Sequence, residues 1–231
     1  MDRRPAIRLG RRSFVQGLWA SAVAAASGEA FADPPSVLTP ILYLQPLGKG
    51  LAADHVDTVK RALLAFYPLH VLELASVALP SEAYYAPRNR YRAERILNFL
   101  EATAAHDAYR VLGLTALDIS TTKGSIPDWG ILGLAAIDGR ACVLSAFRCS
   151  RGVDRARARA RLGKVAVHEI GHTLGLEHCS TVGCLMEDAR GTVTTTDREY
   201  DLCARCRDLL AQSGRRVRPT AKPPWPKPAQ T

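Results

Sequence analysis

Apolar residues recur along this chain in two rhythms, which together predict a succession of strands and helices. Apolar positions three and four residues apart predict helices over Ala52–Phe66 and Tyr91–Ala105. Short apolar runs bounded by turn residues predict four strands, at Val37–Leu44, Leu69–Leu79, Tyr109–Ile119 and Ala141–Phe147. Two strand–helix units in succession favour parallel strands joined by helical crossovers.

Three features of the same region depart from this regular pattern. Because proline has no N–H to donate, Pro40 means that the first strand either lies at a sheet edge or begins at this residue. Ser81–Asn89 is expected to be a loop. Gly124–Ala136 has no helical period and contains Pro127, and we predict a bulged edge strand that flanks a cleft.

The second half of the chain contains a segment, Leu162–Leu176, that is apolar on almost every side of a helix. Such a helix is buried, and its ionisable residues need partners, for which a metal is the obvious candidate. A further helix is predicted over Asp197–Ser213.

With 47% apolar residues in 231, the chain can bury one core. The predicted fold is α/β (α+β): one domain over residues 33–213, with a mixed sheet, an edge strand over the cleft, a buried active-site helix and a C-terminal helix.

Eleven residues at the end of the buried helix read H-E-x-x-H-x-x-G-x-x-H. His168 and His172 are four apart, so on a helix they share one face and can hold one ion. Gly175 permits the turn that ends the helix, and His178 can swing back as a third ligand. Three neutral imidazoles leave one zinc position open, which is the arrangement of a catalytic zinc. Glu169 is placed to take a proton from water at that position. The shorter pattern H-E-x-x-H also arises by chance in ordinary helices, but the full eleven-residue pattern favours a zinc site.

Four cysteines follow in two close pairs, C-x₄-C and C-x₂-C, formed by Cys179, Cys184, Cys203 and Cys206. This spacing is typical of a closed, structural zinc site. The alternative is two disulfides in an exported protein. A Cys203–Cys206 bridge within the predicted helix would be strained, so we favour the metal. Because Cys179 directly follows His178, this second zinc would brace the third histidine.

The remaining two cysteines, Cys142 and Cys149, are interpreted differently. If the segment between them is extended, they lie about 23 Å apart, far beyond the reach of a disulfide. We therefore expect buried or free thiols.

Between these cysteines and the buried helix, four arginines alternate with alanine: Arg155, Arg157, Arg159 and Arg161. Spacing by two spreads their charge around a helix, which predicts a solvated first turn or two, and a grip on acidic substrate is the alternative.

The formal net charge of +9 is concentrated at the two ends of the chain. Residues 1–32 contain five arginines and two acidic residues, and residues 214–231 contain five basic residues and no acidic one, which leaves +1 for residues 33–213. A nearly neutral domain argues against a nucleic-acid partner. The last segment, 214–231, also contains five prolines and is predicted to be a basic, disordered, solvated tail. A polyproline ligand for a partner is the alternative.

Residues 1–32 have the layout of a targeting segment. A basic start leads to Arg11-Arg12-Ser13-Phe14-Val15, an apolar run over Leu18–Ala26, and then Ala30-Phe31-Ala32. This order of regions is that of a signal peptide, and the paired arginines resemble the twin-arginine export signal of bacteria. The apolar run is too short to span a bilayer comfortably. We expect cleavage after Ala32 and a periplasmic or extracellular protein without a stable membrane span; an uncleaved anchor or a disordered basic arm is the alternative.

With both zinc motifs in view, the chain resembles the archaemetzincins, a branch of the metzincin peptidases. The match runs from His168 to Cys206, and Met186 falls in the position of the family's Met-turn. Upstream, Val111–Thr115 with Asp118, and Gly133–Ala135 before Val143–Ser145, resemble its strand segments. The resemblance covers about residues 37–213. It implies a zincin-like fold, a catalytic zinc on the three histidines, Glu169 as general acid and base, and a structural zinc on the four cysteines. The export signal is a departure from the family.

These inferences together predict a monomeric zinc metallopeptidase with two zinc ions per chain and a peptide or protein substrate. Glu169 would take a proton from water and return it to the leaving amine, while the edge strand in 124–136 holds the substrate by strand addition. The alternative is a zinc-binding interaction protein without proteolytic turnover, and Glu169 argues against it because metal binding alone does not require that carboxylate. A four-cysteine module that contacts nucleic acid is disfavoured by the neutral domain.

Overall fold

The computed structural model describes residues 39–189, 192–215, 217–218 and 222–228. The described residues form one compact unit. The expected export signal at residues 1–32 lies outside the described residues. Within the described ranges, no helix is both long and apolar enough to cross a bilayer.

A five-stranded sheet lies at the centre of the described chain, in the order β2-β1-β5-β9-β8. Its strands are β1 (Ile41–Leu47), β2 (His70–Glu73), β5 (Arg110–Thr115), β9 (Ala141–Ser145) and β8 (Gly133–Ala135). The first four are parallel, as the strand–helix units predict, and β8 pairs antiparallel with β9 at one edge. The mixed sheet is therefore confirmed.

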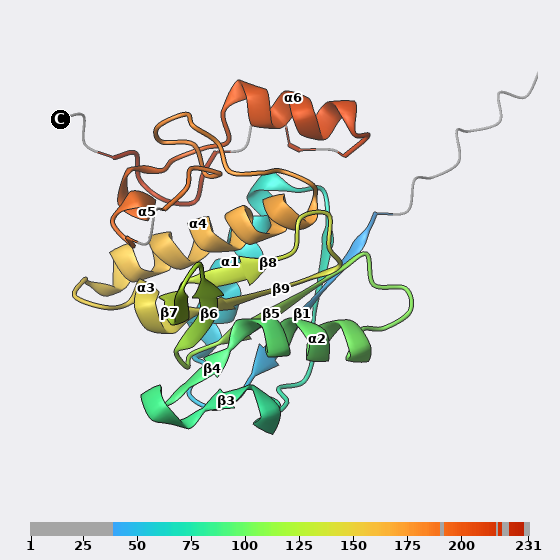
Figure 1. Ribbon diagram of the computed structural model, residues 1–231. Helices are drawn as coiled ribbons and strands as arrows, with labels where there is room; N and C mark the ends of the chain where they lie inside the picture. Colours follow the sequence, from blue (N-terminus) through green and yellow to red (C-terminus); the bar gives the residue numbers. More distant parts are fainter. Residues whose placement is uncertain (1–38, 190–191, 216, 219–221, 229–231) are drawn as a thin grey trace, which may run out of the picture. The chain divides into compact units, whose positions relative to one another are not determined.

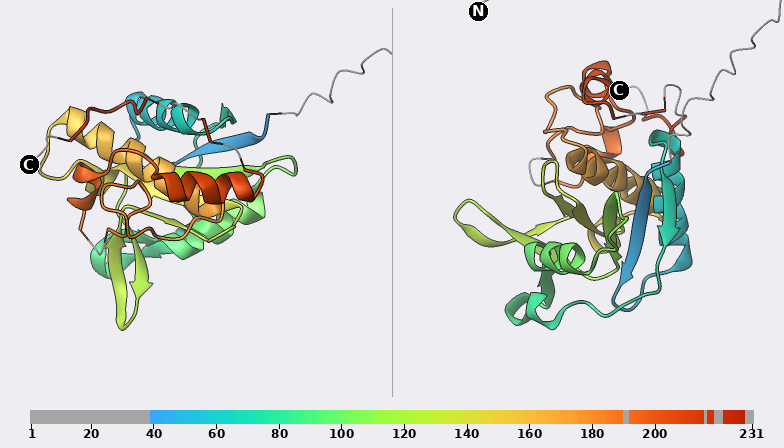
Figure 2. Two further views of the ribbon diagram at one scale, coloured as in Figure 1. Left: turned by 90° about the horizontal axis from the view of Figure 1, so that it is seen from above. Right: turned by 90° about the vertical axis from the view of Figure 1, so that its right-hand side faces the viewer.

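Helices cover both faces of this sheet (Figures 1 and 2). On one face, α1 (Ala53–Phe66) and α4 (Arg155–Thr173) enclose a core with alternate residues of the strands, among them Leu112 and Leu144. On the other, α2 (Ala93–Thr103) packs on the residues between, such as Val143. Both cores exist because side chains alternate along a strand and these strands are apolar on both faces.

A second, four-stranded sheet lies beside the first, in the order β3-β4-β6-β7. Its strands are β3 (Tyr84–Tyr85), β4 (Arg90–Arg92), β6 (Ile119–Lys123) and β7 (Ile126–Ile131). The β6–β7 hairpin projects from the rest of the chain (Figure 2). The β6–β7 hairpin of this sheet follows β5 and precedes β8 in the chain, so the two sheets meet beside the edge strand.

The structure divides two segments that the sequence predicts as single strands. Tyr109–Ile119 becomes β5 and the start of β6, because the chain turns after Thr115, whose hydroxyl accepts from the Leu117 N–H at 3.2 Å. Gly124–Ala136 becomes β7 in one sheet and β8 in the other. An apolar run does not reveal where the chain changes sheet. The prediction of an edge strand beside a cleft is confirmed for β8.

Other element boundaries shift by a few residues. β1 begins directly after Pro40, where the missing N–H does no harm. β2 covers only four residues of the predicted Leu69–Leu79. The predicted loop Ser81–Asn89 contains β3 between two short 3₁₀ helices, η1 (Ser81–Ala83) and η2 (Ala86–Arg88).

The predicted C-terminal helix over Asp197–Ser213 is wrong as one element. It is divided into α5 (Thr195–Arg198) and α6 (Ala204–Gln212). Between them the backbone is extended and bonds to the Cys184 segment: Leu185 N–H donates to the Asp201 carbonyl at 3.0 Å. Cys203 is therefore the N-cap of α6, at the helix start and not within it.

The prediction of a solvated start holds for the first turn of α4, where Arg155 and Arg157 are exposed, but not for the second. Arg161 is buried and forms two hydrogen bonds with the Asp197 carboxylate, at 2.8 and 2.7 Å. Arg155 and Arg159, four apart on one face of α4, both bond to Asp54 of α1. Tertiary partners thus attach this end of α4 to its neighbours.

Trp225 contradicts the prediction of a solvated tail. Its side chain is 6% exposed and stacks on Phe66, with ring centroids 5.6 Å apart and an interplanar angle of 13°. Its Nε1–H donates to the Tyr200 carbonyl at 2.9 Å. At least this part of the last segment is part of the core.

Cys142 and Cys149 are both free and buried, in agreement with the prediction. The reason given for it was only partly right. The segment between them is not extended throughout, because Ser145 caps the short helix α3 (Ala146–Cys149) by accepting from the Phe147 N–H at 3.1 Å.

Candidate active site and metal centres

The helix α4 positions most of the site. Asp154 caps its N-terminus by accepting from the Arg157 N–H at 2.8 Å. Nearly every side chain from Leu162 to Thr173 is buried, and the Tyr67 hydroxyl donates to the Val167 carbonyl at 2.9 Å from the neighbouring helix layer. A helix enclosed in this way holds its histidines in fixed positions.

Gly175 ends the helix in the manner expected from the motif. Its φ of 85° is left-handed, a conformation that glycine adopts without a steric cost. Gly175 N–H donates to the His172 carbonyl at 2.9 Å, and Leu176 N–H to the Gly171 carbonyl at 3.0 Å. These two bonds define a Schellman motif, and the reversal brings His178 back to the helix.

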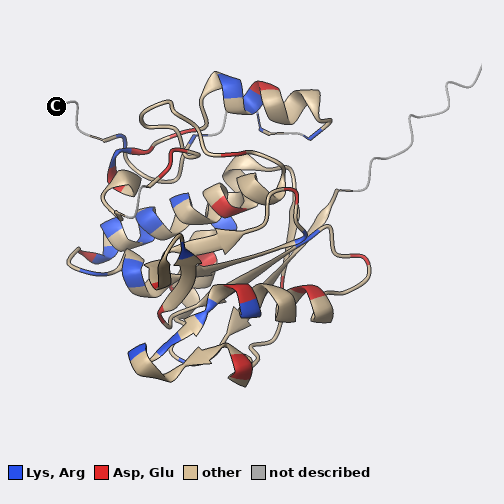
Figure 3. Ribbon diagram, viewed as in Figure 1, with Lys and Arg blue, Asp and Glu red and all other residues tan. Residues whose placement is uncertain are grey.

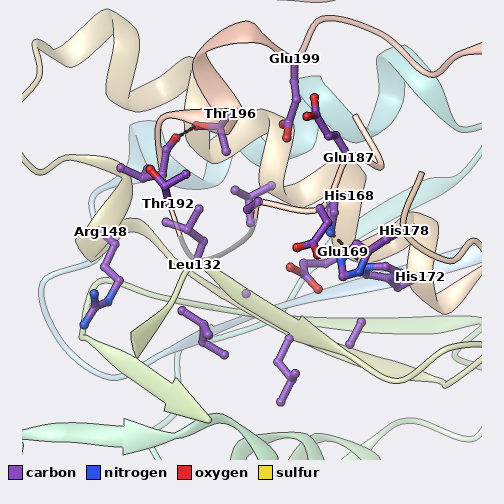
Figure 4. Close-up of a pocket in the computed structure, with 18 of the residues that line it drawn as sticks. Leu132, Arg148, His168, Glu169, His172, His178, Glu187, Thr192, Thr196 and Glu199 are labelled. Atoms are coloured by element: carbon purple, nitrogen blue, oxygen red, sulfur yellow. Dashed lines mark hydrogen bonds between the residues drawn. The ribbon is translucent and has the colours of Figure 1, made fainter. Parts of the chain in front are cut away.

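The structure brings all three predicted histidines together. One ring nitrogen of each lies within 4.8 Å of those of the other two. The ring centroids are 4.5 Å apart for His168 and His172, 5.4 Å for His168 and His178, and 4.8 Å for His172 and His178. Figure 4 shows the three rings beside Glu169 at one end of a cleft.

The hydrogen bonds of the two helical histidines show that the group fits a cation. His168 Nδ1 lies 2.7 Å from the Leu185 carbonyl, and His172 Nδ1 lies 2.7 Å from that of Leu176. Burial lowers the pKa of His168 to about 3 and lowers that of His172 as well, so both rings are neutral. Each neutral ring has a single N–H, which the carbonyl takes, so both Nε2 atoms carry lone pairs. They lie 2.9 Å apart, a distance at which two acceptors repel unless a cation binds both.

Glu169 lies between the two helical histidines in sequence and faces the edge strand in space. Its side chain is 6% exposed. A Cβ atom at Gly133 of β8 would lie 2.5 Å from Glu169 Oε1, so the glycine is what leaves room for the carboxyl group. Burial raises the pKa of Glu169 to about 8, and a bound cation would act in the opposite direction. The group is thus held where a base can reach the cleft.

Met186 lies beneath the histidine-bearing helix. It is fully buried, and a Cβ atom at Gly171 would lie 2.5 Å from its Sδ. The residue before it, Leu185, supplies the carbonyl that orients His168. This segment therefore supports the site from below, in the position of the Met-turn that the resemblance implies.

The four predicted cysteines form a second compact group. Cys179 and Cys203 have their Sγ atoms 3.7 Å apart, and Cys184 and Cys206 have theirs 3.8 Å apart. All four sulfurs lie within 4.8 Å of one another. Four sulfurs bound at about 2.3 Å to one zinc lie about 3.8 Å apart in a tetrahedron. The donor set therefore fits zinc, and all four cysteines are free, not paired in disulfides.

Backbone donors surround these sulfurs. Cys184 Sγ accepts from the N–H groups of Met186 and Cys203, at 3.5 and 3.4 Å. The hydrogen bond between the Cys184 and Cys206 sulfurs, together with these two N–H groups, lowers the pKa of Cys184 to about 5, which favours the thiolate that binds zinc. Cys179 N–H donates to the Met186 carbonyl at 2.6 Å. The cysteine group thus holds the segment that carries both His178 and Met186.

A cleft of about 890 Å³ opens over the histidines. The edge strand β8 forms one wall, and the segment around Thr192 and Thr196 forms part of the opposite wall (Figure 4). Among the described strands, β8 pairs with β9 alone, and its other edge borders the cleft.

Sequence reasoning missed Arg148, which lines the far end of the cleft. Its Nε and one terminal nitrogen donate to the two carboxylate oxygens of Asp118, at 2.7 and 2.9 Å. The sequence points to Asp118 only as part of a segment that resembles the family. No local spacing could have paired the two residues, since they are thirty positions apart.

The fold and the two ligand sets together define a zinc-dependent metallopeptidase. The sequence model of peptidase family M54 matches residues 55–212. The chain belongs to this family, the archaemetzincins. The match leaves residues 1–54 outside, among them the expected export signal.

Named relatives and solved structures agree with this assignment. The chain is 32% identical over 154 residues to archaemetzincin from Halobacterium salinarum, covering 63% of this chain and 85% of that one. It is 30% identical over 178 residues to archaemetzincin from Haloquadratum walsbyi, covering 74% and 99%. The crystal structure of archaemetzincin from Archaeoglobus fulgidus, complexed with malonate, has a TM-score of 0.61 at 32% identity and covers 72% and 97%. That from Methanopyrus kandleri has a TM-score of 0.66 at 28% identity and covers 77% and 97%.

Proposed function

We propose that this zinc metallopeptidase hydrolyses extended polypeptides bound along β8, with Glu169 as the general base. The observation that carries the proposal is the position of Glu169. Its buried carboxyl group lies against Gly133 of the edge strand and beside the three histidines, although it is not one of the ligands. A group in this place can reach a water molecule next to a peptide bond that lies along β8.

His168, His172 and His178 would hold the catalytic zinc. When bound, zinc supplies a Lewis acid that polarises the scissile carbonyl and lowers the pKa of water to about 7. The protein's contribution is the fixed tautomer of the two helical rings, because both donate Nδ1–H to backbone carbonyls and present Nε2.

Glu169 then moves one proton in two steps. It takes a proton from the attacking water as the new C–O bond forms at the scissile carbon. It returns that proton to the amine nitrogen as the C–N bond breaks, which leaves a carboxylic acid and an amine. Burial of Glu169 favours this role, since it raises the affinity of the carboxylate for a proton.

The second edge of β8 would align the substrate. An edge strand presents unpaired N–H and C=O groups that an extended peptide can bond. β8 has β9 on one side and the cleft on the other. Such binding reads the peptide backbone, so it positions the scissile bond without selecting its side chains.

The four cysteines would hold the second, structural zinc. Their set is complete, and three of the four residues are buried, so no position remains for water or substrate. The group ties the segment of His178 and Met186 to the start of α6, and its zinc therefore supports the catalytic histidine without touching substrate.

The test is digestion of a broad peptide library by the zinc-loaded protein beside two variants. Glu169→Gln keeps the ligands and the side-chain volume, and should keep both zinc ions but lose about 10²–10⁴-fold in rate. His172→Ala should lose activity together with one zinc, because two imidazoles hold zinc poorly. Elemental analysis and product mass spectrometry separate the two.

Two outcomes of that digestion contradict the proposal. If Glu169→Gln cleaves as fast as the parent, Glu169 is not the base. If the zinc-loaded parent cleaves no member of the library, a binding protein without turnover becomes the better interpretation.

We also propose that the protein is exported by the twin-arginine route and that the signal is removed after Ala32. The support is in the sequence: paired arginines, a short apolar run and an Ala-Phe-Ala site. Cell fractionation and N-terminal sequencing of the mature protein test it. Replacement of Arg11 and Arg12 by lysine should leave the protein in the cytoplasm, and a parent protein found there with residues 1–32 intact contradicts the proposal.

A further inference from the structure

We infer that the end of the cleft away from the histidines selects a carboxylate, two or three residues beyond the scissile bond on its C-terminal side. The inference rests on the proposed function, whose substrate class it narrows. It is carried by three basic side chains of the cleft lining. Arg148 lies at the end away from the histidines (Figure 4), Lys123 lies over the ring of Trp129, and Arg151 follows Arg148 by three residues.

The direction of the substrate follows from the strand order. β8 runs from Gly133, which touches Glu169, to Ala135, and the residues before it, Gly130 to Leu132, lead away toward Arg148. Figure 4 shows Leu132 between the histidines and Arg148. A peptide antiparallel to β8 runs the opposite way, so the residues after its scissile bond lie beside Leu132 and then Gly130. Three residues of extended chain span about 10 Å.

The basic end retains positive charge after its internal ion pairs are formed. Two carboxylates, of Asp118 and Asp128, are shared by three arginines, namely Arg88, Arg90 and Arg148. One positive charge in this network is therefore not compensated. Arg151 and Lys123 add two more, and neither pairs with a carboxylate in the described part of the chain; Lys123 lies over the Trp129 ring at 5.5 Å.

Arg148 is held in position for a ligand. Asp118 binds its Nε and one terminal nitrogen, which leaves the other terminal nitrogen without a hydrogen-bond partner among the described residues. The side chain is 22% exposed and lines the cleft. A carboxylate can bond there without breaking the pair with Asp118.

The surroundings extend the same charge pattern. Figure 3 shows lysine and arginine gathered around α3, the helix that carries Arg148, and around the beginning of α4. Beside the histidines, the cleft is lined by an exposed acidic residue, Glu177. A peptide with an acidic group on the C-terminal side of the scissile bond is therefore attracted to the positive end of the cleft, whereas a peptide with a basic group there is repelled.

The test varies one position of a peptide that the zinc-loaded protein cleaves. Peptides with Glu, Gln or Lys at the third residue after the scissile bond are compared by kcat/KM. Two further peptides end at that residue, one with a free carboxylate and one with an amide, which separates a side-chain carboxylate from a chain terminus. We expect Glu to exceed Lys by about tenfold, since two or three exposed charge pairs contribute up to about a factor of five each, and the ratio to fall with added salt.

Two variants assign the effect to this end of the cleft. Arg151→Glu with Lys123→Glu should remove or reverse the preference, because both side chains are exposed and no described carboxylate pairs with them. Arg61→Glu is the matched control: it is exposed on α1, outside the cleft, and bonds only to its own helix, so it should leave the ratio unchanged. No preference in the parent, or the same preference in the double variant, overturns the inference.

A binding measurement separates this inference from the proposed function. Fluorescently labelled versions of the same peptides are titrated with Glu169→Gln, which should hold them without cleavage. Tighter binding of the Glu peptide than of the Lys peptide, lost in the Arg151→Glu, Lys123→Glu background, supports the inference even if the parent cleaves nothing. Equal binding of all peptides contradicts it, whatever the activity.

Discussion

At the scale of single residues, the site depends on contacts that leave no room for a larger side chain. Gly133 is the clearest case, because its missing Cβ is what accommodates the Glu169 carboxyl group. Gly171 plays the same part for Met186 on the other side of the helix. The two ligands and the base on α4 are local to the motif, and so is Gly171, whereas Gly133 comes from a strand far away in the sequence.

Gly133→Ala should therefore displace the base without removing metal. The new methyl group would lie 2.5 Å from Glu169 Oε1, so the carboxyl group must move, and a misplaced general base costs on the order of 10²-fold in rate. Zinc content should stay at two ions per chain. The measurements are kcat/KM and elemental analysis.

Gly124→Ala is the matched control for this substitution. It lies in the turn between β6 and β7, where a Cβ meets nothing within 4 Å. Its φ of 57° makes alanine cost about 1 kcal/mol of stability, but the rate should not change. A Gly133→Ala protein as active as this control would show that Glu169 tolerates the displacement.

At the scale of elements, two differently built metal centres are joined through one short segment. The histidine group is carried by α4 and its C-terminal turn, with one ligand exposed. The cysteine group joins the segment after α4 to the start of α6. Because Cys179 follows His178, the closed centre holds the open one in place.

A mild chelator should accordingly separate the two zinc ions. The open three-histidine centre exchanges its metal more readily than the closed four-thiolate centre, whose zinc contributes folding energy. Treatment of the reduced, zinc-loaded protein should remove one zinc and all activity while circular dichroism stays unchanged. Re-addition of zinc should restore activity. Loss of both ions together with the secondary structure would contradict this division of roles.

At the scale of the whole molecule, the last described segment of the chain closes the core behind the active-site helix. Trp225 lies on Phe66 of α1, and a Cβ atom at Gly163 of α4 would lie 3.1 Å from the indole ring. Lys164 has its Nζ 5.9 Å from the same ring. The active-site helix α4 and its neighbour α1 are thus covered by a residue far beyond the catalytic motif.

Trp225→Ala should destabilise the protein by about 3–5 kcal/mol, the usual cost of removing a buried aromatic side chain. Chemical denaturation of the zinc-loaded protein measures the free energy of unfolding. Phe147→Ala is the control, because that ring is 42% exposed and its removal should cost less than about 1 kcal/mol. Equal effects of the two substitutions would mean that Trp225 is not part of the core in solution.

The sequence by itself determined the features that depend on local spacing. A four-residue interval places His168 and His172 on one helix face wherever that helix lies, and Gly175 predicts the turn that brings back His178. Two close cysteine pairs predict one tetrahedral centre. Alternating strand and helix patterns predict the parallel sheet. In each case a short-range rule of backbone geometry is sufficient.

Only the tertiary structure decided where distant segments meet. The division of Gly124–Ala136 between two sheets, the interruption of the predicted helix over Asp197–Ser213, the burial of Arg161 and the docking of Trp225 all depend on partners that no periodicity reveals. The contact between Gly133 and Glu169 and the ion pair between Arg148 and Asp118 also depend on partners that no periodicity reveals. Local propensity is a weak force compared with burial and ion pairing in a packed core, so these contacts follow from the fold as a whole.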